Sequence, residues 1–314
     1  MNGERILITG GFGYVGGRLA LHLTRAADKQ IALGTRSPGP SPDWLRTAAV
    51  VETPWHSDQA LDRACKSMDA VIHVAGMNAQ ECTADPVGAL EMNGVATARL
   101  LRSAIRCGVK RFIYVSTAHV YGPLRGSITE DTCAVSLHPY ATSHRAGEDA
   151  VLFAHEQQAI QGVAIRLSNS FGPPTHGGVN CWALLVNDLC RQAVRTKRLV
   201  LRSSGTQRRD FITLTDACRG IAHLLDIGSE RLGNGLYNLG GKWSPTVIQM
   251  TERIATCCQK LFGHRPEIVR PRTGLDEDAE DVDYRIDKLS SSGFTLTRDV
   301  DAEIIGTLNF CATQ

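Results

Sequence analysis

A glycine-rich segment near the start of the chain, Thr9–Gly16 (TGGFGYVG), limits the possible folds more than any other feature. The apolar run Arg5–Thr9 that leads into it predicts a buried strand, and Tyr14–Arg25 predicts a helix. In such a strand–turn–helix unit the glycines allow a tight turn, a close approach of backbone to a pyrophosphate, and packing of helix on strand. The free N–H groups at the helix start attract phosphates. We therefore predict a dinucleotide site, with a plain structural turn as the alternative, lined by Gly10, Gly11, Phe12, Gly13, Tyr14, Val15 and Gly16.

Short apolar runs alternate with helical patterns through the first two thirds of the chain. Each run has the length of a strand and is bounded by turn or polar residues, which is typical of strands buried on both faces. The predicted strands are Ala48–Val51, Ala70–Val74, Arg111–Ser116 and Val163–Leu167, and the predicted helices are Gln59–Met68, Pro86–Cys107 and Tyr140–Gln161. This alternation predicts an α/β fold with a Rossmann-type, doubly wound parallel sheet and right-handed crossovers.

The rhythm changes after about residue 168. A helix is expected over Trp182–Lys197 and short strands over Leu199–Arg202, Arg209–Leu214 and Leu236–Leu239. We predict a dinucleotide-binding domain over 1–168, to which 215–238 returns, and a smaller C-terminal α/β substrate-binding lobe over 169–214 and 239–314. The acidic stretch Asp276–Asp283 is interpreted as a solvated loop rather than a metal site. A ligand is expected between the two parts, at the carboxyl ends of the strands.

The composition argues against a nucleic-acid-binding, membrane-spanning or secreted protein. With 34 Lys plus Arg against 32 Asp plus Glu, the net charge of +2 gives no strong field toward nucleic acid or an anionic membrane. No apolar run is long enough to cross a bilayer and the start has no secretion signal, so we expect a cytoplasmic protein. The ten cysteines form no C-x-x-C pair and the ten histidines no metal-binding spacing, so we predict reduced thiols and no metal.

The end of the second expected strand, Ile31–Arg36, bears on the choice of dinucleotide. An NAD site commonly has an Asp or Glu there that binds the adenosine ribose, but this chain has Gly34. Without that carboxylate a 2′-phosphate is not repelled, and Arg36, next to Thr35, has the forked guanidinium that binds phosphate. We therefore predict that Thr35 and Arg36 bind NADP(H), with NAD as the alternative and a solvated Arg36 as the plain interpretation.

Two polar groups suggest carbonyl or alcohol chemistry. Thr117 stands at the end of an expected strand and Tyr140 at the start of an expected helix. A hydroxyl and a phenol in these places can meet at one substrate oxygen, the phenol exchanging a proton while hydride moves to or from a nicotinamide.

The chain resembles the extended short-chain dehydrogenase/reductase family, specifically its nucleotide-sugar epimerase/dehydratase branch. The similarity covers nearly the whole chain and rests on Thr9–Gly16, His73–Gly76, Asn93, Ser116–Thr117, Tyr140, Arg166–Pro173, Arg209–Ile212 and Tyr237–Gly241. It implies that Tyr140 is the catalytic acid/base and that Thr117 faces the substrate. It also implies cofactor contacts at Ala75, Asn93 and Ser116, a nucleoside-diphosphate sugar held by Asn169 and Arg209, and a homodimer formed through Pro86–Cys107 and Tyr140–Gln161. The plain interpretation of Arg209 is an ion pair with Asp210 or the acidic stretch.

The chain departs from the family at one catalytic position. The family motif is Tyr-x-x-x-Lys, and this chain has His144 four residues after Tyr140, on the same helix face. In the family the lysine holds the nicotinamide ribose and lowers the tyrosine pKa, whereas histidine is mostly neutral above pH 7. We consider three interpretations: His144 is a cofactor-binding and catalytic substitute that works when charged, catalysis runs mainly toward reduction with neutral Tyr140 donating the proton, or the protein is a weakened enzyme.

The family resemblance leaves a choice of reaction. Dehydratases of the family carry an Asp-Glu pair after the Thr and the decarboxylases a Glu, but this chain has Ala118 and His119, so both reactions are disfavoured. Two activities remain: a nucleotide-sugar 4-ketoreductase, which we favour because of Gly34, Arg36 and the missing lysine, and a 4-epimerase with retained NAD. His119 is interpreted as a loop side chain, with an acid near the substrate as the alternative. A non-catalytic NADP(H) sensor and a reductase of non-sugar ketones also stay open.

Overall fold

The computed structural model describes residues 3–37, 39–271 and 280–314. Its centre is a sheet of seven parallel strands in the order β11-β7-β5-β4-β1-β2-β3. The strands are β1 (Glu4–Thr9), β2 (Lys29–Thr35), β3 (Ala49–Glu52), β4 (Ala70–His73), β5 (Arg111–Thr117), β7 (Gln161–Leu167) and β11 (Leu236–Leu239). The chain order reverses between β1 and β4, where doubly wound sheets bind their ligands. The predicted Rossmann-type fold is confirmed.

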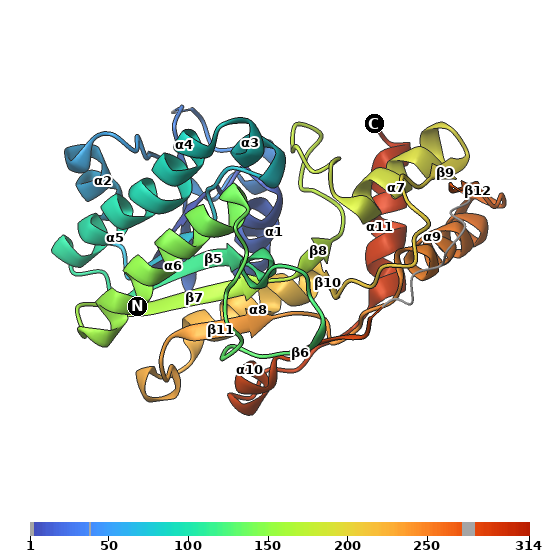
Figure 1. Cartoon of the computed structure of the whole chain (residues 1–314). Helices are drawn as coiled ribbons and strands as arrows, with labels where there is room; N and C mark the ends of the chain where they lie inside the picture. Colours follow the sequence, from blue (N-terminus) through green and yellow to red (C-terminus); the bar gives the residue numbers. More distant parts are fainter. Residues whose placement is uncertain (1–2, 38, 272–279) are drawn as a thin grey trace.

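Helices cover both faces of this sheet (Figure 1). On one face lie α1 (Tyr14–Leu23) and α8 (Leu214–Asp226), and on the other α2 (Asp58–Cys65), α5 (Ala96–Arg106) and α6 (Pro139–Glu156). Ile6 and Ile8 of β1 point into the first core and Leu7 into the second, each fully buried. Because both sides of the strand are dry, its sequence is an unbroken apolar run rather than an alternating one.

The long helix predicted over Pro86–Cys107 is interrupted. After the short α3 (Ala79–Ala84), the structure has α4 (Pro86–Ala89), a π-helical turn (Leu90–Val95) and then α5. A π turn inserts an extra residue into the helix and is often found at functional sites. Here it carries Asn93, whose side chain is fully buried.

A smaller C-terminal part has its own core. Helices α7 (Leu185–Arg195), α9 (Val247–Phe262) and α11 (Val300–Ala312) pack together around apolar side chains such as Leu189, Met250 and Leu308 (Figure 1). Short strands pair in parallel: β8 (Asn169–Phe171) with β10 (Phe211–Thr213), β9 (Arg198–Val200) with β12 (Glu267–Val269), and β6 (Gly126–Ile128) with β13 (Val282–Tyr284). The remaining short helices are α10 (Asp287–Ser291) and the 3₁₀ turns Asp43–Leu45, Ala118–Tyr121 and Ser229–Arg231. The predicted residue boundaries between the two parts stay a prediction.

Several predicted elements end elsewhere. Helix α6 stops at Glu156 rather than Gln161, because Gln158 adopts a left-handed conformation (φ 56°) and the chain turns into β7. The strand predicted over Arg209–Leu214 is shorter, with Leu214 already in α8. The solvated loop predicted over Asp276–Asp283 is wrong at its end, where Asp283 lies in β13, while residues 276–279 lie outside the described residues.

No helix within residues 3–37, 39–271 and 280–314 is long and apolar enough to cross a membrane. Of the ten cysteines, all free, eight are buried, one is intermediate and one is exposed.

A buried ion pair joins α6 to the sheet. Glu148 is fully buried, and its carboxylate accepts hydrogen bonds from Arg166 Nη2 at 2.8 Å and from Ser116 Oγ at 2.6 Å. One residue further along the helix, Asp149 pairs with Arg145 at 2.8 Å on the surface. The two pairs lie in opposite environments on the same helix.

The Glu148→Gln variant should lower the free energy of unfolding by about 3–5 kcal/mol, because it leaves the Arg166 cation buried without a counter-charge. The Asp149→Asn control should change it by less than about 0.5 kcal/mol, since exposed pairs contribute little. Urea unfolding of both variants measures the difference, and equal effects would contradict the assignment.

Candidate functional site

The glycine-rich turn forms a cradle at the switch point of the sheet. Gly10 has a positive φ of 69°, and a Cβ there would lie 2.7 Å from the backbone nitrogen of Ala75, just past β4. A Cβ at Gly16 would collide with the carbonyl oxygen of Gly10. Gly13 precedes α1 and supplies no side-chain cap, so the first N–H groups of the helix are left for another acceptor. An uncapped, dipole-positive helix start behind a glycine turn fits a dinucleotide pyrophosphate.

The Tyr14 side chain of this turn also contacts the C-terminal part. The Tyr14 hydroxyl donates to the carbonyl of Gly172 at 2.9 Å and lies 3.2 Å from Oδ1 of Asn187. The Phe12 ring packs edge-on against Trp44, at 6.2 Å between centroids. Of the predicted cofactor residues, Tyr14 therefore has only its backbone free for a phosphate, while its side chain holds the two parts together.

The end of β2 has an open guanidinium. Gly34 is buried, and a Cβ there would lie 3.1 Å from Cγ2 of Thr53. The Thr35 hydroxyl is 3.2 Å from the Ser37 carbonyl. Arg36 is exposed and has no ion pair with any carboxylate in the described part of the chain.

The structure brings Thr117 close to Tyr140, although the two residues are far apart along the chain. Thr117 ends β5, and Tyr140 lies in the first turn of α6, where His138 caps the helix and Pro139 begins it. Burial raises the pKa of Tyr140, and the Thr117 hydroxyl partly offsets this by interacting with the phenol. Tyr140 is therefore a neutral phenol near pH 7.

His144 lies beneath Tyr140 and is 6% exposed. The two rings meet edge to face at 4.6 Å, and Nδ1 of His144 is 2.7 Å from the hydroxyl of Tyr114 on β5. Burial, with a smaller contribution from the nearby His119, lowers the pKa of His144 to about 3. The imidazole is therefore neutral at pH 7, and the positive charge considered for it is not present in this environment.

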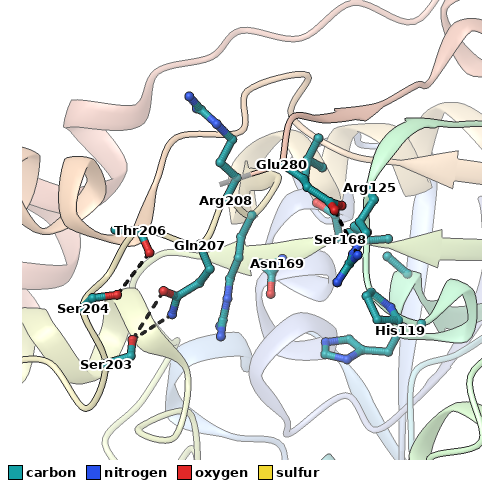
Figure 2. A pocket seen from close by; sticks show the side chains of 16 residues that line it. His119, Arg125, Ser168, Asn169, Ser203, Ser204, Thr206, Gln207, Arg208 and Glu280 are labelled. Carbon is teal, nitrogen blue, oxygen red and sulfur yellow. Dashed lines mark hydrogen bonds and ion pairs between the residues drawn. The ribbon is translucent and has the colours of Figure 1, made fainter. Parts of the chain in front are cut away.

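A cavity of about 840 Å³ opens beside these residues. His119 and Asn169 face it, across from a polar wall of Ser203, Ser204, Thr206 and Gln207 (Figure 2). The His119 ring also contacts that of Tyr140 edge-on, at 5.7 Å between centroids. This volume suits a drug-sized or nucleotide-sized ligand.

Three arginines line the cavity: two of them form ion pairs with carboxylates, and the third does not pair with any described carboxylate. Arg125 pairs with Glu280 at 3.0 Å and Arg208 with Asp281 at 3.5 Å. Arg209 is exposed and makes no ion pair with a described carboxylate. Desolvation lowers the pKa of Arg209, but the ordinary pKa of an arginine is so high that the guanidinium stays charged at pH 7. The neighbouring Asp210 does not neutralise it, because that carboxylate is buried and accepts from Ser168, Gly241 and Trp243.

Residues 6–240 match the NAD dependent epimerase/dehydratase family. The chain belongs to this family. It is 27% identical over 331 residues to a UDP-glucose 4-epimerase of Azospirillum brasilense, covering 96% of this chain and 94% of that protein.

Solved structures share the fold. A UDP-glucuronic acid 4-epimerase from Bacillus cereus, in complex with UDP-glucuronic acid and NAD, has a TM-score of 0.79 at 22% identity over 98% of this chain and 99% of that one. RMD from Pseudomonas aeruginosa, complexed with NADPH, has a TM-score of 0.80 at 23% identity over 99% and 98%. The predicted family and the prediction of an enzyme of the extended short-chain dehydrogenase/reductase type are confirmed.

Within this family member, two predicted cofactor contacts use their side chains elsewhere. Asn93 Oδ1 accepts the Met77 N–H at 2.9 Å, and its Nδ2 donates to Ser143 Oγ at 3.0 Å. The Ser116 hydroxyl is held by Glu148. Both side chains position the backbone around the site rather than pointing into it, and their roles as cofactor contacts stay predictions, as do those of the other predicted site residues.

Asn169 and the missed residues belong to the same cavity. Asn169 Nδ2 donates to the carbonyl of Asp210 at 2.9 Å, which ties the cavity floor together. Arg125, Arg208 and the polar wall were not predicted from the sequence, and His119 was interpreted as a loop side chain, with an acid near the substrate as the alternative. The doubled Arg208–Arg209 and the hydroxyl-rich Ser203–Gln207 were the signals that point to them.

Two buried neutral histidines predict a dependence of stability on pH. The pKa values of His73 and His144 are both lowered to about 3, mainly by burial, from the ordinary 6.5. Between these values the unfolded chain binds more protons than the folded one, so the free energy of unfolding falls as pH decreases. From pH 7.5 to pH 5 we expect a loss of about 2 kcal/mol for each such histidine.

Urea unfolding of His144→Gln at the two pH values isolates one histidine. Its loss should be about 2 kcal/mol smaller than that of the wild type. The control His56→Gln, at an exposed position, should keep the wild-type loss. Parallel behaviour of all three proteins would show that His144 titrates normally in the folded state.

Proposed function

We propose that this protein is an NADP(H)-dependent reductase of the 4-keto group of a nucleoside-diphosphate sugar. The observation that carries the proposal is the pairing of a neutral Tyr140 phenol with Thr117 at a site where position 144 supplies no positive charge. A neutral phenol donates a proton to a ketone that accepts hydride, whereas oxidation of an alcohol needs the phenolate as base. The site therefore favours reduction.

The cradle and the end of β2 support NADP(H) as the cofactor. The first turn of α1 would hold the pyrophosphate, and Arg36 would hold the 2′-phosphate that distinguishes NADP from NAD. Gly34 offers no carboxylate to repel that phosphate. When bound, the reduced cofactor supplies hydride to the substrate carbon.

The residues of the chain supply binding and the proton. Arg209 and Asn169 face the cavity and would bind the diphosphate, Arg209 with a charge that no described carboxylate neutralises. Thr117 donates a hydrogen bond to the carbonyl oxygen, and the Tyr140 hydroxyl gives its proton to that oxygen as the alcohol forms. The buried floor of His144 and Tyr114 keeps water from beneath the phenol.

A 4-epimerase is the second candidate, favoured by the similarity to a UDP-glucose 4-epimerase over 96% of this chain. An epimerase must first oxidise the C4 alcohol, so it needs Tyr140 as a base. The raised pKa of Tyr140 and the neutral His144 make that step the weaker one here.

We also propose a homodimer. The exposed apolar side chains on the predicted pairing helices are Val87, Leu90, Val95 and Phe153, from α4, the π turn and α6. Apolar side chains gathered on adjoining elements are typical of a protein–protein interface.

Oxidation of NADPH with a panel of 4-keto nucleotide sugars tests the reaction. The Tyr140→Phe variant should reduce turnover by a factor of roughly 10² or more, because the general acid is lost. The control Tyr237→Phe, which removes a buried hydroxyl remote from the cavity, should stay close to wild type. Interconversion of UDP-glucose with its C4 epimer, without net NADPH oxidation, would instead establish the epimerase.

Arg36→Ala tests the cofactor. Removing one forked phosphate contact should weaken NADPH binding by roughly 10-fold and leave NADH binding unchanged. The control Arg46→Ala removes another exposed arginine, which is paired with Asp43. Fluorescence titration of both dinucleotides gives the two dissociation constants, and equal weakening of both would argue against a 2′-phosphate contact.

A further inference from the structure

A chain of buried polar groups runs from the sheet to the catalytic helix. Tyr114, in the middle of β5, is 1% exposed, and its hydroxyl lies 2.7 Å from Nδ1 of His144. The two rings are 5.8 Å apart and nearly parallel, at 28°. On the other side Tyr114 stacks on His73, at 5.6 Å and 26°. The phenol that meets His144 therefore belongs to a rigid central strand.

Close packing fixes the Tyr114 ring. A Cβ at Gly147 of α6 would lie 2.8 Å from Cζ of Tyr114 and 2.7 Å from the Asn93 carbonyl oxygen. Only a glycine lets α6 approach this closely, and the approach leaves the phenol no space to swing away. The hydroxyl of Tyr114 has two acceptors within reach, the His144 Nδ1 atom and the Asn93 carbonyl at 3.3 Å.

The neighbouring hydrogen bonds decide between these acceptors. The Thr97 hydroxyl donates its one hydrogen to the Asn93 carbonyl at 2.6 Å, so it accepts from Nε2 of His73 at 3.0 Å. Nδ1 of His73 then accepts from the Thr9 hydroxyl at 2.6 Å. The Asn93 carbonyl is thus already engaged by a shorter bond. A phenol is also a far stronger acid than a neutral imidazole N–H, which favours O–H···N between Tyr114 and His144.

We infer that Tyr114 is a positioning residue that holds His144 as the neutral Nε2–H tautomer. With Nδ1 occupied as an acceptor, Nε2 carries the hydrogen. Nε2 makes no hydrogen bond within the described residues. It is not completely enclosed either, so it reaches accessible space. The ring borders Gly76, where a Cβ would lie 3.6 Å from Cε1 of His144, just past β4 at the cofactor edge.

The role assigned to this N–H rests on the proposed function. The family's lysine offers a charged donor to the nicotinamide ribose, whereas Nε2–H of His144 offers one uncharged donor in a fixed direction. Without Tyr114 either nitrogen could carry the hydrogen, and the donor would be present only part of the time. The phenol of Tyr114 therefore selects the one tautomer of His144 in which Nε2 is always a hydrogen-bond donor.

Nitrogen NMR of the cofactor-free protein tests the tautomer directly. With ¹⁵N-labelled histidine, long-range ¹H–¹⁵N spectra at pH 7 distinguish the Nε2–H, Nδ1–H and charged forms. The signals of His144 are those absent from the His144→Gln spectrum. We expect the pure Nε2–H pattern in the wild type, and an Nδ1–H or charged pattern would overturn the inference whatever the activity of the protein.

Tyr114→Phe tests the cause. It should shift His144 toward a mixture of tautomers and weaken NADPH binding by roughly 3- to 10-fold, the usual effect of one hydrogen bond. Tyr237→Phe, the matched control, loses a buried hydroxyl that bonds Arg231 and Leu232 and should change neither. A pure Nε2–H pattern retained in a folded Tyr114→Phe would overturn the inference.

His144→Gln and His144→Asn give a second measurement that does not depend on Tyr114→Phe folding. The glutamine amide places an N–H donor near the Nε2 position, and the asparagine amide places one near Nδ1. We expect NADPH to bind His144→Gln within about 3-fold of wild type and His144→Asn more than about 10-fold more weakly. The reverse order would overturn the donor role. An absence of ketone reduction with the Nε2–H pattern intact would count against the proposed reaction alone.

Discussion

The docking of α6 on β5 is the contact on which the site depends. Tyr140, His144 and Glu148 are spaced four residues apart, so they lie on one face of the helix. Each meets a β5 residue or its extension: Tyr140 meets Thr117, His144 meets Tyr114, and Glu148 meets Ser116. Gly147 brings the two elements close enough for these contacts. A shift of the helix along the strand would break all of them together.

The site combines neutral histidines beneath the phenol with charged arginines in the cavity lining. Beneath the phenol the two histidines are held neutral by burial, and the Glu148 carboxylate is matched by Arg166. In the cavity lining, Arg125 and Arg208 have acidic partners, while Arg209 has none among the described residues. An anionic ligand would therefore meet its strongest attraction at Arg209.

The sheet could be predicted from the sequence, and so could the positions of Thr117 at a strand end and Tyr140 at a helix start. Both follow from local patterns: buried strands are continuous apolar runs, and parallel strands place their carboxyl ends at one edge. The end of α6 was wrong because a glutamine, Gln158, takes the left-handed turn where a glycine is the usual signal. Helices α9 and α11 were not predicted, although Thr246 and Gln249 form a capping box at the start of α9.

The surroundings of His144 could not be predicted for a different reason. Helical spacing places it in the lysine's position, but its charge depends on burial and on a hydroxyl thirty residues earlier in the chain. The spacing of Tyr114 and His144 in the sequence does not predict their contact, because the contact forms only when helix α6 packs on strand β5. The same holds for Arg209. Its charge stays unpaired because the Asp210 carboxylate accepts hydrogen bonds from other groups, such as the Gly241 N–H.

The two departures from an NAD-type site lie at opposite ends of the proposed cofactor site. In the proposed site, Gly34 and the exposed Arg36 would add a phosphate contact at the adenosine end, and the neutral imidazole of His144 would replace the family's ammonium at the nicotinamide end. Binding energy would thereby be moved away from the reacting ring. An epimerase must keep its cofactor through both half-reactions, so it benefits from a firm hold on the nicotinamide ribose. A reductase must release the oxidised cofactor after every turnover, and a weaker, uncharged contact at that end allows it to do so without loss of selection at the other.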